Sequence, residues 1–292
     1  MNELIRASLM RAVAQRLPSR LRHRAARFLY DYESGSVRGV NVVVDYAGDL
    51  NLKFLLNTKD IIGWNIFVHG SYERETNRLL REHVKPDDVV IEVGANNGSE
   101  TVLLGRLVGA AGQVHAFEPI PHVRQQLAVN VMLNELDQQV RLCALALGEK
   151  KGDVIFHLMP RSAPNQGNSS KIAFQEASEK LVVPQTTLDL WAAGANLQRL
   201  DLLKMDIQGS ELDLLRGGVE TLRRFRPIIF TEADTLGDHS LSDLWHMFNS
   251  LDYRVFNVRP GGLDPLSTAL GLPRGNWIAF HPHRDPQRKV SA

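Results

Sequence analysis

The order of apolar and polar residues along this chain changes near Asp88. From there on, short apolar runs alternate with longer segments in which apolar residues recur with the period of a helix. Short apolar runs are typical of buried strands, and the longer segments are typical of helices that bury one face. Because strands that alternate with helices form parallel sheets, the pattern predicts a sheet covered by helices on both faces.

The expected strands are 89–93, 114–118, 140–147, 200–207, 227–233, 253–258 and 276–281. Helices are expected between them at about 99–109, 121–134, 209–224 and 240–251. The last two strands have no clear helix between them, so they can pair as an antiparallel hairpin. We therefore predict an α/β fold with a doubly wound, mostly parallel sheet and an antiparallel C-terminal strand.

Three segments outside this alternation have patterns of their own. Residues 40–56 alternate apolar and polar positions around a Gly-Asp turn, which predicts a β-hairpin. Residues 70–84 are expected to form a helix with Ser71 near its N-terminal cap. Residues 159–180 are polar and rich in Gly, Ser and Asn, so they should form a long loop, either a lid or binding loop or a disordered excursion.

The N-terminus is basic and amphipathic. Residues 1–30 contain seven arginines and a single acid, Glu3. The apolar residues that recur at every fourth position are Ile5, Leu9, Val13 and Leu17. They predict a helix that either packs on its own domain or rests on an anionic membrane or a partner. An arginine-rich, acid-poor start is also a feature of organelle transit peptides.

These patterns divide the chain into three expected parts. An N-terminal extension of basic helices and the hairpin covers residues 1–58, one α/β domain covers 59–283, and a flexible tail covers 284–292. The formal net charge is +1, so no nucleic-acid partner is expected. A single cysteine, Cys143, excludes an intrachain disulfide and suits a reducing compartment. We therefore expect a cytoplasmic protein, with any membrane contact peripheral and made through residues 1–30.

The candidate chemistry begins at VIEVGANNGSE, residues 90–100. Gly94 ends the first strand of the alternating region, where ligands bind in a doubly wound sheet. A glycine there allows a sharp turn and lets a ligand approach the backbone. Asn96 and Asn97 tolerate unusual backbone angles, and a helix that starts near Ser99 points its N–H groups at the same place. This stretch therefore predicts a ligand cradle.

The acids around this loop indicate which ligand it holds. Glu118 ends the second strand, where an acid can bind both hydroxyls of a ribose. The loop lacks the middle glycine of the dinucleotide fingerprint and offers no Lys or Arg for a phosphate. Glu92, two residues before Gly94, would repel a pyrophosphate but suits an ammonium or a sulfonium group. S-adenosylmethionine carries both groups and a ribose, and it is the expected cofactor.

At this point the sequence resembles the FkbM-type, S-adenosylmethionine-dependent methyltransferases. The segments that carry the resemblance are GSYERE (70–75), VIEVGANNGSET (90–101), VHAFEPIP (114–121), ALGE (146–149), TTLD (186–189), LLKMDIQGSELDLLRG (202–217) and IIFTEAD (228–234). Within them, KMDIQGSE is the most specific. Two positions depart from the family pattern, because Glu92 stands where Asp is usual and Gln208 where an acid is usual.

The resemblance implies a Rossmann-like, class I methyltransferase fold. Together with the loop and the ribose acid, it leads to one set of expected cofactor-binding residues. These are Glu73, Glu92, Gly94, Ala95, Asn96, Asn97, Gly98, Glu118, Pro119 and Ala146. The implied reaction is O-methylation of a hydroxyl on a sugar, a glycolipid or a polyketide-like small molecule.

An alcohol acceptor is a poor nucleophile and needs a base or a metal to take its proton. The candidate catalytic residues are Asp206 and Glu232, which end the fourth and fifth strands, and Glu211 in the helix between them. Asp206 is the first candidate, although it could instead cap that helix. A divalent cation shared by Asp206 and Glu232 is a further option. Lys204 should be buried and paired with Glu92 or Glu232.

Two other classes of function remain open from the sequence. One is an NAD(P)-dependent oxidoreductase, which the missing glycine and Glu92 disfavour. The other is a catalytically silent protein that binds an adenosyl ligand or serves as a scaffold. Two aromatic residues, Trp64 and Tyr72, could line an acceptor pocket or fill the core.

Overall fold

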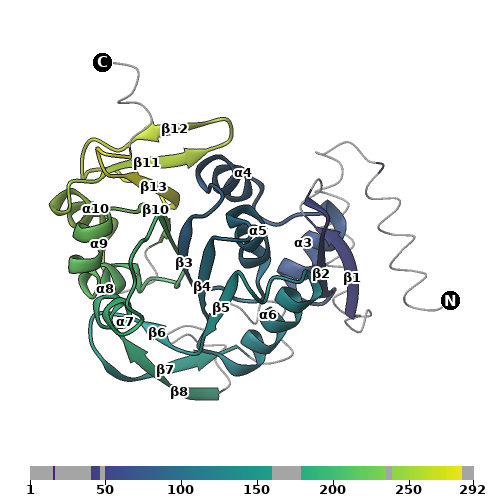
Figure 1. Ribbon diagram of the computed structural model, residues 1–292. Coiled ribbons are helices and arrows are strands. Elements are labelled where there is room, and N and C mark those ends of the chain that lie inside the picture. The colour runs from purple at the N-terminus through teal and green to yellow at the C-terminus, as the bar shows by residue number, and fades with distance from the viewer. Residues whose placement is uncertain (1–15, 17–40, 47–49, 160–178, 235–238, 285–292) are drawn as a thin grey trace.

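The computed structural model describes residues 16, 41–46, 50–159, 179–234 and 239–284 (Figure 1). The expected N-terminal helices lie outside the described residues apart from Arg16. Most of the expected 159–180 loop and nearly all of the tail lie outside them as well. Within the described residues, no helix is both long and apolar enough to cross a membrane.

Eight strands of the described residues form one sheet in the order β12-β11-β13-β10-β9-β3-β4-β5. They are β3 (Val89–Val93), β4 (Gln113–Phe117), β5 (Val140–Cys143), β9 (Leu202–Met205), β10 (Ile228–Ala233), β11 (Arg254–Arg259), β12 (Gly262–Pro265) and β13 (Gly275–Phe280). The five neighbouring strands β5, β4, β3, β9 and β10 are parallel, whereas β13 is antiparallel to both β10 and β11. The predicted mostly parallel α/β sheet with an antiparallel C-terminal strand is confirmed.

The chain reverses its direction of winding between β3 and β9. It runs outward from β3 through β4 to β5, then returns to add β9 on the other side of β3. In such sheets a crevice opens at the carboxyl ends of the strands where the order reverses. The strand order therefore puts the predicted ligand loop, which follows β3, at this crevice.

Two hydrophobic cores cover the two faces of the sheet, because successive residues of a strand point in opposite directions. For example, Val90 packs in the first core and Ile91 in the second. The helices of the first core are α3 (Ile61–His69), α4 (Arg74–His83), α5 (Ser99–Val108) and α6 (Pro121–Leu133). The helices of the second are α7 (Leu188–Gly194), α8 (Glu211–Arg216), α9 (Val219–Phe225) and α10 (Leu241–Ser250).

The expected N-terminal hairpin is present as β1 (Asn41–Tyr46) and β2 (Leu52–Asn57), which pair in antiparallel register. Its apolar side chains belong to the first core. Asn130 of α6 and Asn134, which caps the C-terminus of that helix, accept hydrogen bonds from the backbone N–H groups of Leu55 and Lys53, both at 2.7 Å. Their amide groups thus bind β2 much as a neighbouring strand would. A domain boundary after residue 58 remains a prediction.

The prediction of a single strand over residues 140–147 is wrong, because this segment forms two strands that belong to different sheets. β5 ends at Cys143, and β6 (Ala146–Leu147) joins a small sheet with β8 (Glu179–Thr186) and β7 (Gly152–Leu158). Leu142 packs against the first core and Leu147 lies in the second, so the apolar run is continuous although the chain turns. β7 and β8 were not expected, and the first two residues of β8 had been assigned to the loop.

The expected helix 209–224 is also divided. α8 ends at Arg216 and α9 begins at Val219, with Gly217 and Gly218 between them. A Cβ atom on Gly217 would lie 2.1 Å from the carbonyl oxygen of Gly148, so the chain approaches another backbone segment there. The periodic apolar pattern continues across the break because both helices bury leucines in the second core.

Candidate functional site

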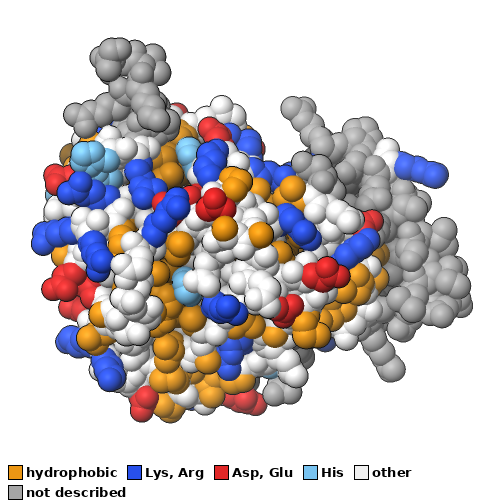
Figure 2. All heavy atoms as spheres, viewed as in Figure 1, with side chains coloured by type: hydrophobic (Ala, Val, Ile, Leu, Met, Phe, Trp, Pro, Cys, Tyr) orange, Lys and Arg blue, Asp and Glu red, His pale blue; other side chains and the backbone are white. Residues whose placement is uncertain are grey.

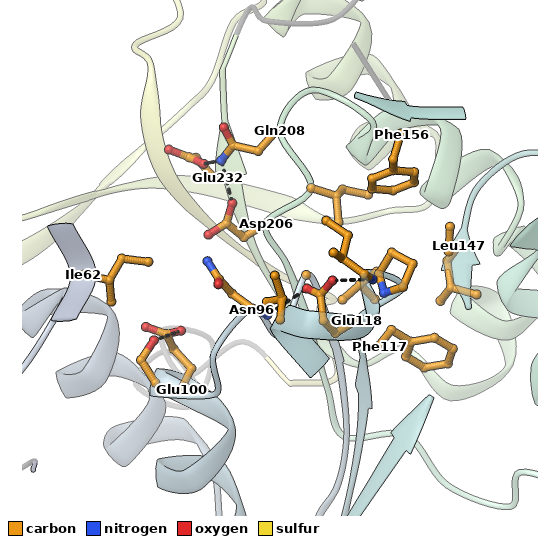
Figure 3. Close-up of a pocket in the computed structure, with 18 of the residues that line it drawn as sticks. Ile62, Asn96, Glu100, Phe117, Glu118, Leu147, Phe156, Asp206, Gln208 and Glu232 are labelled. Atoms are coloured by element: carbon orange, nitrogen blue, oxygen red, sulfur yellow. Dashed lines mark hydrogen bonds between the residues drawn. The ribbon is translucent and has the colours of Figure 1, made fainter. Parts of the chain in front are cut away.

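A cavity of about 330 Å³ lies at the carboxyl ends of β3, β4, β9 and β10 (Figure 3). Of the expected site residues, eight line it. They are Glu73, Gly94, Asn96, Glu118, Pro119, Ala146, Asp206 and Glu232. Strands that are distant in sequence therefore bring most of the candidate set to one place.

Gly94 is required at this position by the neighbouring strand. Its φ is +81°, a value that residues with a side chain rarely adopt. A Cβ atom on Gly94 would lie 1.9 Å from the carbonyl oxygen of Asp206. The sequence predicts a glycine here for a sharp turn and for the approach of a ligand. The structure adds a second reason, because the β3–α5 loop passes directly against the backbone that follows β9.

Gly98 serves the other end of the same loop. It precedes α5 with a φ of +93°, and a Cβ atom there would lie 2.6 Å from Cδ1 of Leu127 on α6. Gly98, Ala95 and Asn97 are not among the residues that line the cavity, and Ala95 and Asn97 are buried. These three residues therefore shape the loop from behind.

Glu118 is held against the cavity wall by backbone donors. Its Oε2 accepts a hydrogen bond from the N–H of Asn96 at 3.1 Å, and its Oε1 accepts one from the N–H of Ile120 at 2.8 Å (Figure 3). Burial raises the pKa of Glu118 to about 7, although these hydrogen bonds and Arg124 oppose the shift. Each carboxylate oxygen keeps a second lone pair for a ligand hydroxyl.

The cavity wall beside Glu118 is apolar. Phe117 and Leu147 line this part, together with Phe156 of β7 (Figure 3). Ile120, whose N–H binds Glu118, also lines the cavity. Phe156 was missed in the sequence, because the segment that forms β7 had not been recognised as a strand. The small sheet therefore contributes to the cavity as well as the large one.

Asp206 and Glu232 form a carboxylate pair that Gln208 bridges. The Gln208 Nε2 group donates to Oδ1 of Asp206 and to Oε2 of Glu232, both at 3.1 Å (Figure 3). Burial, the charge of Asp206 and a hydrogen bond shared with Asp206 raise the pKa of Glu232 to about 8. Asp206 does not cap a helix, since α8 begins after Ser210 and its first turn has no side-chain cap. That alternative is wrong.

Lys204 is the buried cation of the site. Its Nζ lies 3.8 Å from Oε2 of Glu100 and 3.7 Å from Oδ2 of Asp206. Burial by itself lowers the pKa of Lys204, but the surrounding carboxylates outweigh it and raise that pKa, so the ammonium group stays charged. The expected burial is confirmed. The sequence predicts an ion pair with Glu92 or Glu232, whereas the carboxylates within 4 Å of the ammonium group are those of Glu100 and Asp206. The charge of Glu92 still helps to raise the pKa of Lys204.

Two of the expected acids lie behind the wall. Glu92 is 0% exposed, and its Oε2 accepts a hydrogen bond from Oγ1 of Thr101 at 2.6 Å. Glu211 is 4% exposed, and its Oε1 accepts a hydrogen bond from the N–H of Ile207 at 2.9 Å. Neither is among the residues that line the cavity. We therefore interpret both as supports of the loops rather than as groups that meet a ligand.

Three further acids line the cavity. Glu73 accepts a hydrogen bond from Oγ1 of Thr76 at 2.7 Å, and burial together with the charge of Glu100 raises its pKa. Glu100 and Asp234 also line the cavity and were not named from the sequence. An acid in the first turn of a helix commonly interacts with the helix dipole, so the pattern around Glu100 gave no distinct signal. Among the described residues, no three His, Cys, Asp or Glu side chains are grouped as they would be to hold a metal.

Residues 92–255, more than half of the chain, match the methyltransferase FkbM domain. The chain belongs to this family. The 2-O-methyltransferase NoeI of Sinorhizobium fredii is 31% identical, and the match covers 51% of this chain and 64% of NoeI. The hexuronic acid methyltransferase AglP of Haloferax volcanii is 26% identical, with 54% of this chain and 61% of AglP covered. The chain thus spans less than two thirds of either relative.

Among solved structures, methyltransferase FkbM from Methylobacillus flagellatus has a TM-score of 0.43 at 15% identity, over 75% of this chain and 52% of that one. Most of the cavity falls within the family match. The loop after β3, Glu118 and the carboxylate pair all lie between residues 92 and 255. Ile62, Tyr72 and Glu73 line the cavity from outside the matched region. Trp64, by contrast, is buried against Phe67 and fills the core.

Proposed function

We propose that this protein is an S-adenosylmethionine-dependent methyltransferase that modifies a hydroxyl group of a small-molecule or glycan acceptor. The observation that carries the proposal is the position of Glu118 between an apolar wall and the carboxylate pair of Asp206 and Glu232. A nucleoside matches this arrangement, because its flat, apolar base lies on one side of the ribose and can face the apolar wall while the ribose diol faces Glu118. Membership of the FkbM methyltransferase family supports the reaction class.

The residues present fit this cofactor. Glu118 offers two oxygens to the ribose hydroxyls, and Phe117, Leu147 and Phe156 offer an apolar surface to the adenine. The wall contains no Lys, Arg or His among its described residues, which suits a sulfonium compound and disfavours the pyrophosphate of NAD(P). The oxidoreductase alternative therefore has little support from the cavity.

When bound, S-adenosylmethionine supplies a methyl group that is already activated for transfer. The protein must then orient the acceptor hydroxyl and remove its proton. Asp206 has 29% of its side chain exposed and faces the cavity, so we assign it the role of base. Gln208 holds Asp206 beside Glu232, which keeps its own proton near neutral pH because its pKa is raised. Metal dependence stays outside this proposal.

Two relatives support the acceptor class by their names, a 2-O-methyltransferase and a hexuronic acid methyltransferase. We therefore propose a sugar-type or otherwise polyhydroxylated acceptor, free or lipid-linked. On the face seen in Figure 2, basic side chains are scattered with acidic ones between them. Together with a net charge of +1, this supports an acceptor other than nucleic acid.

The first test is titration calorimetry of the purified protein with S-adenosylmethionine and, separately, NAD. We expect micromolar binding of S-adenosylmethionine, weakened at least tenfold by Glu118→Ala, and no heat with NAD.

Asp206→Asn should bind the cofactor as the wild type does but lose about 100-fold or more in methyl transfer, the usual contribution of a general base. A folded protein that binds only NAD would replace the proposal with an oxidoreductase. Cofactor binding without methyl transfer to any hydroxylated acceptor would favour the catalytically silent alternative.

We also propose, from the sequence alone, that the protein is cytoplasmic and touches anionic membrane through residues 1–30. The arginines beside an apolar stripe motivate this proposal. Vesicle flotation with anionic lipids should recover the full chain and not a chain that lacks residues 1–30. Equal flotation of both forms would reject the membrane contact.

A further inference from the structure

Glu100 carries an unpartnered carboxylate oxygen at the cavity. Its side chain is buried, with the residue 5% exposed, yet it lines the cavity. Its Oε2 accepts a hydrogen bond from the Ser99 hydroxyl at 2.7 Å and lies 3.8 Å from Nζ of Lys204. Its Oε1 is buried and has no hydrogen-bond partner among the described residues. An acceptor left unpaired in a buried place destabilises the protein unless a ligand or a water molecule supplies a donor.

No described residue donates a hydrogen bond to this oxygen. Lys204 is the nearest cation, but it is beyond hydrogen-bond distance and is shared with Asp206. Lys204 does not line the cavity, and the described residues of the wall include no basic side chain. A suitable ligand group therefore brings its own hydrogens and, to balance an anion in a partly enclosed site, a positive charge. An ammonium group meets both conditions, whereas a sulfonium group has charge but no N–H or O–H donor.

The position of Glu100 agrees with this chemistry. Glu100 lies across the cavity from Phe117 and Phe156, with Glu118 between the two sides (Figure 3). A nucleoside whose ribose meets Glu118 and whose base meets the aromatic side directs its 5′ substituent away from that side. In S-adenosylmethionine this substituent is the methionine part, which ends in an ammonium group.

We propose that Glu100 binds the ammonium group of the cofactor's methionine part, an inference that rests on the proposed function. The sequence had assigned the cationic contact to Glu92. That residue is fully buried behind the wall and held by Thr101, so it cannot reach a ligand in the cavity without a rearrangement. Glu100, in the first turn of α5, presents its carboxylate at the cavity instead.

The test compares three ligands by calorimetry on wild type and Glu100→Gln. S-adenosylmethionine and S-adenosylhomocysteine both have the ammonium group, and 5′-methylthioadenosine has neither the ammonium nor the carboxylate of the amino acid. We expect Glu100→Gln to weaken both amino-acid ligands at least tenfold and to leave 5′-methylthioadenosine within about twofold. Glu82→Gln is the matched control, since it removes the carboxylate of an exposed glutamate outside the cavity and should leave all three affinities unchanged.

Other patterns overturn the proposal. If wild type and Glu100→Gln bind each of the three ligands equally well, Glu100 does not contact the ammonium group. If only S-adenosylmethionine binding is lost, Glu100 contacts the sulfonium group instead. An equal loss for all three would indicate a general disturbance of the cavity. Because Glu100 also lies near Lys204, Glu100→Asp is the second variant: it keeps the charge, withdraws the carboxylate by one methylene, and should show the same ligand pattern in a folded protein. Failure of folded wild type to bind any of the three would reject the cofactor assignment itself.

Discussion

At the scale of single residues, the site depends on backbone geometry as much as on functional groups. Gly94 lets the loop after β3 pass against the backbone of Asp206, and the bridging amide of Gln208 joins Asp206 to Glu232. The side-chain amide at position 208 shares its N–H hydrogens between the two carboxylates. An acid there could not donate to both carboxylates as the amide does. This residue therefore tunes the pair in this chain.

Gly94→Ala should be strongly destabilising. A left-handed backbone with a side chain costs about 1 kcal/mol, and the overlap with Asp206 forces a further shift of two backbone segments, so we expect a total above about 3 kcal/mol. Chemical denaturation of the purified variants measures this. Gly70→Ala is the control, because Gly70 has a similar φ of +75° with nothing within 4 Å of the added Cβ, and it should cost about 1 kcal/mol. Similar values for both variants would show that the contact with Asp206 relaxes easily.

At the scale of elements, the N-terminal hairpin is connected to the ligand loop through α6. Asn130 accepts from the N–H of Leu55 in β2, and its amide donates to the carbonyl oxygen of Asn97 at 2.9 Å. A single buried side chain thus ties the hairpin to the loop after β3. The family match begins only at residue 92, so this connection links a segment outside the match to the cavity.

Asn130→Ala should release this connection. Two buried backbone groups lose their partners, so we expect a loss of about 2–4 kcal/mol in the free energy of unfolding. Hydrogen exchange should show faster exchange at the Leu55 amide, while the Lys53 amide stays protected by Asn134. Met132→Ala, at a position 64% exposed on the same helix, should change neither. Unchanged exchange at Leu55 would contradict the role given to Asn130.

At the scale of the whole molecule, the structure concentrates buried acids around one cavity. Burial raises the pKa of Glu92, Glu118 and Glu211 to about 7, and burial with the charge of Asp206 raises that of Glu232 to about 8. When these buried carboxyl groups ionise, the loss of hydration and the repulsion between like charges lower the stability of the folded protein. A ligand with positive charge offsets that repulsion, which fits the proposed cofactor.

Stability without ligand should therefore fall as the pH rises. Unfolded glutamates titrate near pH 4.3, so between about pH 5 and pH 8 these four carboxyl groups bind more protons in the folded chain than in the unfolded chain. Because the pKa of each of these glutamates is higher in the folded chain, their contribution to the free energy of unfolding is favourable at low pH. It is lost as the pH rises through their folded pKa values of about 7 to 8. We expect the melting temperature at pH 8.5 to be lower than at pH 5.5 by about 4 °C or more, measured by scanning calorimetry.

Two matched variants check the source of this dependence. Glu118→Gln removes one of the buried titrating groups and should make the fall shallower. Glu82→Gln removes a glutamate whose side chain is 56% exposed and should leave the slope as it is. A melting temperature that rises over this range would contradict the raised pKa values.

The sequence by itself determined the α/β fold, the position of the ligand loop and the two carboxylates of the pair, because these follow from local periodicity and from the rule that parallel strands end at one edge. It did not determine where the chain leaves one sheet for another, since Leu142 and Leu147 are equally apolar in different cores. Only the tertiary structure decided that Glu100 faces the cavity while Glu92 lies behind it, and that Phe156 lines the apolar side. A side chain's exposure to a cavity depends on which neighbouring elements pack against it, and that information is spread over segments far apart in the chain.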